Sequence, residues 1–194
     1  MKNALFIDRD GVINKMIFID GQFDSPQNPR QVSLVEGIID LITWLNKKGV
    51  PVVEVTNQPG AALGKMKLAT LKKIEKKIHK LLNNKGAHID HIYSCLHHLE
   101  AKLAKFKILC ACRKPKAGLL LQAGLELNIN LKKSVILGDN ATDMKAGKKV
   151  GTRTILFFHT NDTPEKVIAK QNYPSDFRVY SHQETLLILK KLFK

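Results

Sequence analysis

Two carboxylates at positions 8 and 10 are the residues of this sequence best placed to do chemistry. They stand in the run Leu5-Phe6-Ile7-Asp8-Arg9-Asp10-Gly11, directly after an apolar segment that predicts a short buried strand. Gly11 lets the chain turn away. Acids at such a strand end can face a common point in the crevice beyond the carboxyl ends of a parallel sheet, where open α/β folds bind ligands. An ordinary Asp-x-Asp-Gly turn is the alternative.

A second pair of acids follows a later apolar run. Ser134 to Leu137 predicts another buried strand, and Asp139 leaves its end as Asp8 leaves the first. If a helix begins at Ala141, Asp143 can lean back toward the same point. Carboxylate oxygens together with a substrate phosphate are what Mg²⁺ prefers. A helix cap made by Asp139 or Asn140 is the other interpretation, and it can coexist with metal binding.

Two further segments offer groups that bind phosphate. The apolar run 50–55 predicts a strand that delivers Thr56 and Asn57 to the same edge, and the Thr56 hydroxyl can donate to a phosphoryl oxygen. Arg113-Lys114-Pro115 presents two cations, and a lysine ammonium is a compact charge suited to phosphate. A strand-ending turn and a surface Lys-Pro pair are the alternatives.

All three cysteines of the chain lie in one loop-like segment. After Cys95-Leu96-His97-His98, Cys110-Ala111-Cys112 follows with twelve residues between His97 and Cys110. An odd, clustered set argues against a disulfide framework. Three thiolates and one imidazole match a tetrahedral structural zinc site. We therefore predict Zn²⁺ on Cys95, His97, Cys110 and Cys112, with His97 favoured over His98 because the Cys-x-His spacing puts alternate residues on one side.

The totals limit the class of protein. The 194 residues suit a single domain, 1–194, and the hydrophobic content of 44% is ample for a core. With 32 Lys and Arg against 17 Asp and Glu, the formal charge of +15 attracts anions. Aromatic residues make up only 6%, which disfavours nucleic-acid recognition. No apolar stretch approaches the roughly 20 residues that span a bilayer, so we expect a cytoplasmic protein without membrane contact.

The intervening segments predict strands that alternate with helices. Helices are indicated after Gly37, from Leu68 to Leu82, after Pro115, from Ala141, from Pro164 and near the C-terminus; strands are indicated at 89–93, 152–158 and 177–180. Residues 14–29 are rich in turn formers and are expected to be an irregular substrate loop over the first strand end. This alternation indicates an α/β fold, a Rossmann-like, mostly parallel sheet with helices on both faces.

Four sets of residues, in this order, resemble the motifs of the haloacid dehalogenase (HAD) superfamily: Asp-x-Asp-Gly at 8–11, Thr-Asn at 56–57, Lys-Pro at 114–115 and Gly-Asp-x-x-x-Asp at 138–143. The match extends from Leu5 to Gly151. With Cys-x-His and Cys-x-Cys just before Arg-Lys-Pro, the chain looks like the D-glycero-D-manno-heptose 1,7-bisphosphate 7-phosphatase group, which is related to histidinol-phosphate phosphatases. The resemblance implies a zinc-held loop and no large cap domain.

The resemblance also implies a role for each matched position. Asp8 would attack phosphorus to form an aspartyl-phosphate, and Asp10 would protonate the leaving alkoxide and later deprotonate water. Asp8, the backbone carbonyl of Asp10, and Asp139 would bind Mg²⁺, with Asp143 orienting that shell. The expected substrate contacts are Thr56 and Lys114 on the phosphoryl oxygens, with Asn57 and Arg113 nearby.

The sequence therefore predicts a magnesium-dependent phosphatase that acts as a monomer on a small phosphorylated metabolite. Heptose 1,7-bisphosphate, in lipopolysaccharide precursor synthesis, is the favoured substrate. Histidinol phosphate is an alternative, disfavoured by the long spacing from His97 to Cys110. Phosphorylated nucleic-acid ends and a basic binding protein on a phosphatase scaffold are further alternatives. Leu63 and Asn140 stand where the heptose enzymes often carry cations, which bears on the choice of substrate but leaves hydrolysis intact.

Overall fold

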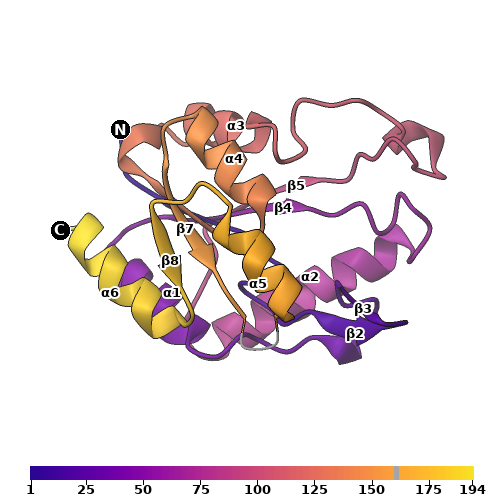
Figure 1. Cartoon of the computed structure of the whole chain (residues 1–194), viewed down its shortest axis with the longest axis horizontal. Coiled ribbons are helices and arrows are strands. Elements are labelled where there is room, and N and C mark those ends of the chain that lie inside the picture. The colour runs from indigo at the N-terminus through magenta and orange to yellow at the C-terminus, as the bar shows by residue number, and fades with distance from the viewer. Residues whose placement is uncertain (160–161) are drawn as a thin grey trace.

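A six-stranded parallel sheet forms the centre of the molecule. The structure is a computed structural model that describes residues 1–159 and 162–194. All neighbouring strands of the sheet run parallel. Their order is β5 (His91–Cys95), β4 (Val52–Asn57), β1 (Leu5–Ile7), β6 (Val135–Gly138), β7 (Arg153–Phe157) and β8 (Phe177–Val179). Strands alternate with helices along the chain, so the predicted α/β fold is confirmed (Figure 1).

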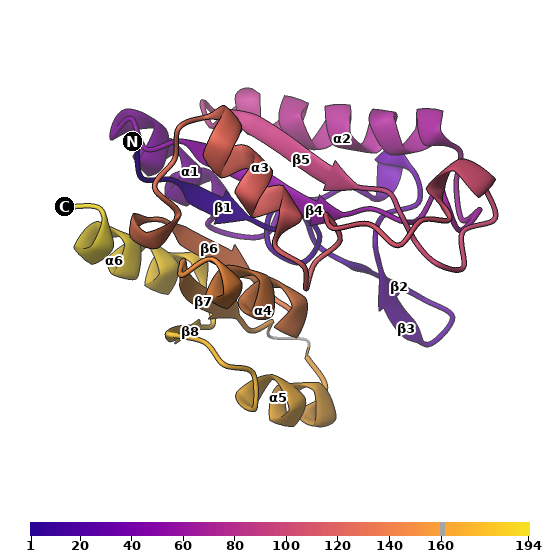
Figure 2. The ribbon, with the colours of Figure 1, turned by 90° about the horizontal axis from the view of Figure 1, so that it is seen from above.

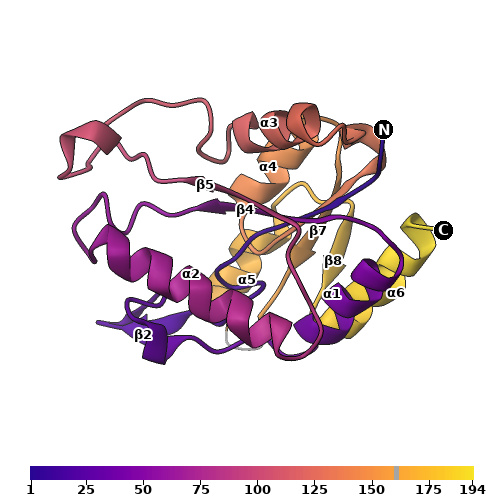
Figure 3. The same cartoon turned by 180° about the vertical axis from the view of Figure 1, so that it is seen from behind.

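Helices cover both faces of this sheet (Figures 1 and 3). One face carries α1 (Ile38–Lys47), α2 (Leu68–Asn83) and α6 (His182–Leu192). The other carries α3 (Gly118–Glu126), α4 (Ala141–Lys149) and α5 (Pro164–Gln171). Figure 2 shows α2 and α3 on opposite sides of β4 and β5. No helix in the described ranges is both long enough and apolar enough to cross a bilayer.

The central strand β1 is buried on both faces because its side chains alternate between two cores. Leu5 and Ile7 pack with α1 and α2, whereas Phe6 packs with α3. Pairing places Ile7 beside Glu54 of β4 and Leu137 of β6. The carboxyl ends of β4, β1 and β6 are therefore neighbours, and the residues that follow them meet at one edge of the sheet.

Three sequence-based expectations need correction. The segment 14–29 is not wholly irregular, because it contains an antiparallel hairpin of β2 (Ile17–Ile19) and β3 (Gln22–Asp24), followed by a short 3-10 helix (Pro29–Gln31). The hairpin turn is Asp20-Gly21, and both residues have positive φ (49° and 78°), as a tight two-residue hairpin turn requires.

The other two corrections concern element boundaries. Pro115 does not open a helix: Lys116 N donates to Arg113 O at 2.9 Å in a turn, and α3 begins only at Gly118. The strand expected at 89–93 lies two residues later, at His91–Cys95. That shift places Cys95 inside the sheet, paired with Asn57.

Candidate active site

Three carboxylates meet at the carboxyl edge of the sheet. Asp8 follows β1, Asp139 follows β6, and Asp143 lies in the first turn of α4. Each offers an oxygen, and the three oxygens lie within 4.8 Å of one another. Gly11 has a φ of 87°, and a Cβ at this position would lie 2.5 Å from Asp139 Oδ2, so only glycine lets the turn pass this close. The acids that the sequence placed at two separate strand ends therefore form one cluster.

Lys114 supplies a buried cation to this cluster. Its Nζ lies 3.0 Å from Asp8 Oδ1 and 2.5 Å from Asp143 Oδ1, and donates to Val55 O at 2.7 Å. The residue is only 3% exposed, so it is not part of a surface Lys-Pro pair. Asn57 fixes its backbone: Asn57 Nδ2 donates to Lys114 O, and Lys114 N donates to Asn57 Oδ1, both at 3.0 Å. Asn57 was expected near the substrate, and both ends of its amide bind the backbone of Lys114.

The electrostatics of the cluster leave a surplus of negative charge. Burial, together with the charges of Asp143 and Asp139 and against the opposing effect of Lys114, raises the pKa of Asp8 to about 8. Burial likewise raises the pKa of Asp143, while the two carboxylates Asp143 and Asp8 raise the pKa of Lys114 in spite of its burial. Lys114 contacts two of the three acids, Asp8 and Asp143, and a divalent cation would neutralise the remaining negative charge. The oxygen donor set therefore fits Mg²⁺.

Helix α4 begins where the sequence predicted it, at Ala141. Asn140 is the N-cap: its side chain accepts from Thr142 N, and Asp143 Oδ2 accepts from Asn140 N at 3.2 Å. The other oxygen of Asp143 faces Lys114. One carboxylate thus closes the helix end and joins the acidic cluster, so capping and site formation coexist.

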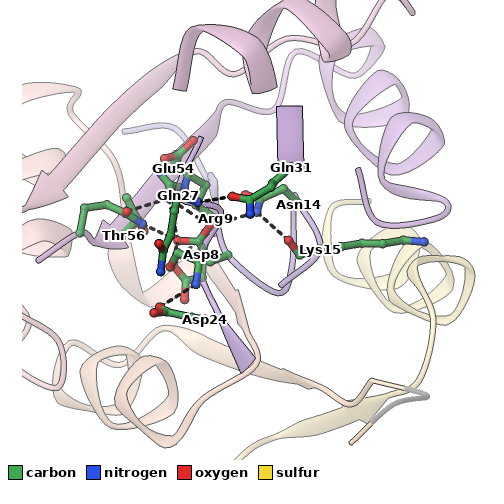
Figure 4. Close-up of polar contacts among 12 residues, drawn as sticks. Asp8, Arg9, Asn14, Lys15, Asp24, Gln27, Gln31, Glu54 and Thr56 are labelled. Atoms are coloured by element: carbon green, nitrogen blue, oxygen red, sulfur yellow. Dashed lines mark hydrogen bonds and ion pairs between the residues drawn. The ribbon is translucent and has the colours of Figure 1, made fainter. Parts of the chain in front are cut away.

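Asp10 has surroundings different from those of Asp8. Its oxygens accept from Arg9 Nη2 at 2.7 Å, Gln58 Nε2 at 2.6 Å, Asn14 Nδ2 at 3.0 Å and Ser25 Oγ at 2.9 Å. Burial alone would raise its pKa, but the Arg9 guanidinium and these donors hold it below the usual range. Figure 4 shows two of the neighbouring residues, Arg9 and Asn14, with Asp8 close by. The carboxylate form of Asp10 is held firmly in place.

Several of these contacts were not foreseen from the sequence. Arg9 stands between the two acids, and Gln58 directly follows Thr56-Asn57. Only this closeness in the sequence to predicted site residues could have indicated that either one belongs to the site. Asn14 and Ser25 gave no signal. His159, which follows β7, places Nε2 3.1 Å from Asp139 Oδ2 and was also missed.

The cysteine segment forms a second cluster beside β5. The Sγ atoms of Cys95, Cys110 and Cys112 are separated by 3.1–3.6 Å, and His97 Nδ1 is 3.3 Å from Cys112 Sγ. Zinc bonds of about 2.3 Å in a tetrahedron would place sulfurs about 3.8 Å apart, so the set fits zinc after a small expansion. His98 instead accepts from Glu100 N through Nδ1.

The thiols of this cluster have different pKa values. Burial raises the pKa of the Cys95 thiol, whereas Cys110, despite its burial, has its pKa held at about 6 by donation from Cys112 and from the amide of Arg113. A group of thiols that already favours one thiolate is suited to a metal, because thiolate is the ligand form. Arg113 Nη1 donates to His97 O at 3.4 Å and lines a 250 Å³ cavity together with Lys114.

Comparison with known proteins identifies the family. A family profile described as HAD-hydrolase-like matches residues 111–183. The chain is 36% identical over 159 residues to the D-glycero-beta-D-manno-heptose-1,7-bisphosphate 7-phosphatase of Vibrio cholerae, covering 82% of each chain. Against the Escherichia coli K12 enzyme of the same name it is 34% identical over 164 residues, covering 84% of this chain and 83% of that one. The chain belongs to this phosphatase family.

Solved structures of the family share the fold. The D,D-heptose 1,7-bisphosphate phosphatase from B. bronchiseptica, complexed with magnesium and phosphate, matches with a TM-score of 0.80 and 26% identity over 98% of this chain and 99% of that chain. A putative HAD-like phosphatase from Mesorhizobium loti also gives 0.80, with 29% identity over 99% of this chain and 86% of that one. The predicted resemblance and the HAD fold are thereby confirmed.

Proposed function

We propose that this protein is a magnesium-dependent phosphomonoesterase that removes the 7-phosphate of D-glycero-D-manno-heptose 1,7-bisphosphate through an aspartyl-phosphate. The observation that carries the proposal is the Lys114 ammonium 3.0 Å from Asp8, within a cluster of three carboxylates of which Asp139 and Asp143 are buried. This arrangement pairs a nucleophile with a cation that can receive a phosphoryl oxygen. The names of the relatives, and a similar protein solved with magnesium and phosphate, support the choice.

The reaction divides between the two acids of the first motif. Asp8 Oδ attacks phosphorus, and the bond to the leaving oxygen breaks as Asp10 gives that oxygen a proton. Asp10, now a carboxylate, takes a proton from water, and the water attacks the aspartyl-phosphate to release phosphate and restore Asp8. The donors around Asp10 suit this second half, because they favour its carboxylate form.

The remaining groups stabilise negative charge and form no covalent bond during the reaction. Lys114 and the hydroxyl of Thr56 bind phosphoryl oxygens, which carry the negative charge of the transition state. Mg²⁺ would be held by Asp8, the backbone carbonyl of Asp10, and Asp139, and it neutralises phosphoryl charge when bound. Asp143 orients Lys114 and the acidic cluster.

A zinc ion on Cys95, His97, Cys110 and Cys112 is proposed as a structural part of the enzyme. Four protein ligands leave no open position, which is typical of structural rather than catalytic zinc. The segment between these ligands exposes Leu99, Leu103, Ile108 and Leu109, so apolar packing does little to hold it.

The substrate is proposed to be a small phosphorylated sugar that meets Arg113 beside the reacting phosphate. We further propose that residues 1–194 act as one unit, as a monomer in the cytoplasm, and without nucleic acid. Histidinol phosphate remains the competing substrate, because Leu63 and Asn140 lack the charge that would bind a second phosphate.

A phosphate-release screen tests the function. The substrates are heptose bisphosphate, histidinol phosphate, other sugar phosphates and a 3′-phosphorylated oligonucleotide, each with Mg²⁺ and with a chelator. We expect magnesium-dependent release, fastest from the heptose. Faster release from histidinol phosphate would reassign the substrate, and no release from any ester would overturn the proposal.

A further inference from the structure

Both polar atoms of the Gln58 side chain form hydrogen bonds at the proposed catalytic site. Its Nε2 donates to Asp10 Oδ2 at 2.6 Å and to Thr56 Oγ1 at 2.8 Å, and its Oε1 accepts from Arg9 Nη2 at 2.7 Å. The residue is 4% exposed. One amide therefore links the Thr56 hydroxyl, which is proposed to bind a phosphoryl oxygen, to the Asp10 carboxylate, which is proposed to serve the leaving group.

The direction of these bonds matters for Thr56. A threonine hydroxyl has one hydrogen to donate and two lone pairs. Because Gln58 occupies a lone pair of Oγ1, the hydroxyl hydrogen is left to bind a phosphoryl oxygen. With the amide reversed, Gln58 Oε1 would compete for that same hydrogen.

Arg9 determines which way the amide faces. A guanidinium has only donors, so the end of Gln58 that meets Nη2 must be Oε1, which turns Nε2 toward Asp10 and Thr56. Arg9 is itself 2% exposed and binds Asp10 through Nε and Nη2 at 3.0–3.2 Å as well as 2.7 Å. In spite of burial, the negative charges of Asp10 and Glu54 raise the pKa of Arg9. Glu54 is fully buried in β4, and its Oε2 lies 3.4 Å from His79 Nε2 on α2. Figure 4 shows Glu54 and Arg9 beside each other.

We propose that Gln58 is a positioning residue that holds the Thr56 hydroxyl and the Asp10 carboxylate in one fixed relation, with Arg9 locking its amide in the orientation that serves both. The inference rests on the proposed function, in which Asp10 protonates the leaving oxygen. Gln58 touches neither phosphorus nor the leaving oxygen in this scheme. Its effect on the reaction passes through Asp10 and Thr56.

The test compares two esters that differ in their need for a proton. p-Nitrophenyl phosphate expels a stable phenolate, whereas an alkyl ester such as a sugar phosphate needs the proton from Asp10. The parameter is kcat/KM, which reports the first phosphoryl transfer. In Gln58→Met, which keeps the length and loses the bonds, we expect kcat/KM for the alkyl ester to fall by about 10- to 100-fold and that for the aryl ester by only about threefold. Arg9→Lys keeps the positive charge but loses the planar guanidinium that binds Asp10 and Gln58 together. We expect it to give the same selective loss of kcat/KM with the alkyl ester.

A double-mutant cycle and a matched control complete the test. In an Asp10→Asn background, Gln58→Met is expected to cause little further loss with the alkyl ester, because the residue it positions can no longer give a proton. Gln31→Met removes an amide that accepts from Gln27 N and Asn28 N rather than binding Asp10, and is expected to leave both esters unaffected. Urea unfolding of each variant checks the fold.

Two results would overturn the inference while leaving the phosphatase assignment standing. One is a fall in kcat/KM in Gln58→Met that is equal for the two esters. The other is a fall in kcat/KM on adding Gln58→Met that is the same in the wild-type and Asp10→Asn backgrounds. If the wild-type protein hydrolyses neither ester, the proposed function falls and the positioning role falls with it. A selective alkyl-ester loss that disappears in the Asp10→Asn background supports it.

Discussion

Replacing Lys114 by methionine removes the ammonium that contacts Asp8 and Asp143 while keeping most of the side-chain volume. The Lys114 side chain is 2% exposed, and its partners Asp143 and Asp8 are 0% and 15% exposed. Breaking a buried ion pair costs about 3–5 kcal/mol, because the remaining charges lose their partner where little water can reach them. For a chain of 194 residues this corresponds to a fall in melting temperature of about 6–20 °C in metal-free protein.

Urea unfolding at neutral pH, with a chelator and then with Mg²⁺, measures this effect. We expect Mg²⁺ to raise the unfolding free energy of Lys114→Met more than that of the wild type, because the cation restores positive charge among the three acids. Lys148→Met is the control: Lys148 Nζ is also 2.5 Å from its partner, Asp176 Oδ1, but the two side chains are 41% and 23% exposed. That pair should contribute less than about 1 kcal/mol.

Equal destabilisation by the two lysine substitutions would contradict this reasoning, because contact distance rather than burial would then set the cost. So would a stabilisation by Mg²⁺ that is the same in the wild type and in Lys114→Met. If Lys114→Met does not fold without metal, its recovery by Mg²⁺ but not by an equal ionic strength of Na⁺ answers the same question.

Three other outcomes are expected. Asp8→Asn should abolish phosphate release with the fold retained, and full activity there would exclude Asp8 as nucleophile. Metal analysis of reduced protein should find about one zinc per chain, and Cys112→Ser should lose most of it; a zinc-free, folded wild type would remove the structural site. Burial, against its bond to Val12 O, lowers the pKa of His182 to about 4. As the pH falls, the unfolded chain takes up that proton before the folded chain does. The free energy of unfolding should therefore be at its full value above about pH 6.5 and fall by about 3 kcal/mol toward pH 4. In His182→Gln, the free energy of unfolding measured with urea should depend less on pH.

The order of strands and helices could be predicted because apolar runs and turn residues alternate clearly along the chain. Helix α1 begins one residue after Gly37, and α4 begins at Ala141, both as expected. Boundaries were less certain where polar residues enter a strand, as with His91 and Ser94 in β5. The Asp20-Gly21 turn was visible in the sequence, but the short strands beside it gave too few alternating residues to identify a hairpin.

The sequence indicated which residues gather at the site but not how their hydrogen bonds are shared. Strand order brings the ends of β4, β1 and β6 together, and that follows from topology alone. Which partner each amide selects depends on side-chain directions that no spacing encodes. Asn57 binds the backbone of Lys114, and Gln58 binds Asp10, although they are adjacent in the sequence. Adjacent residues of a strand end point to opposite sides, so their roles diverge.

The cysteine cluster and Lys114 are connected through the backbone. Cys95 pairs with Asn57 in the sheet, and its carbonyl accepts from Gln58 N at 2.7 Å. Cys112 is two residues before Lys114, whose backbone is held by that same Asn57. A metal bound by both Cys95 and Cys112 would therefore link the end of β5 to the segment that carries Lys114, which Asn57 already connects from the other side. Loss of zinc should thus weaken phosphate hydrolysis through the placement of Lys114, even though no zinc ligand belongs to the acidic cluster.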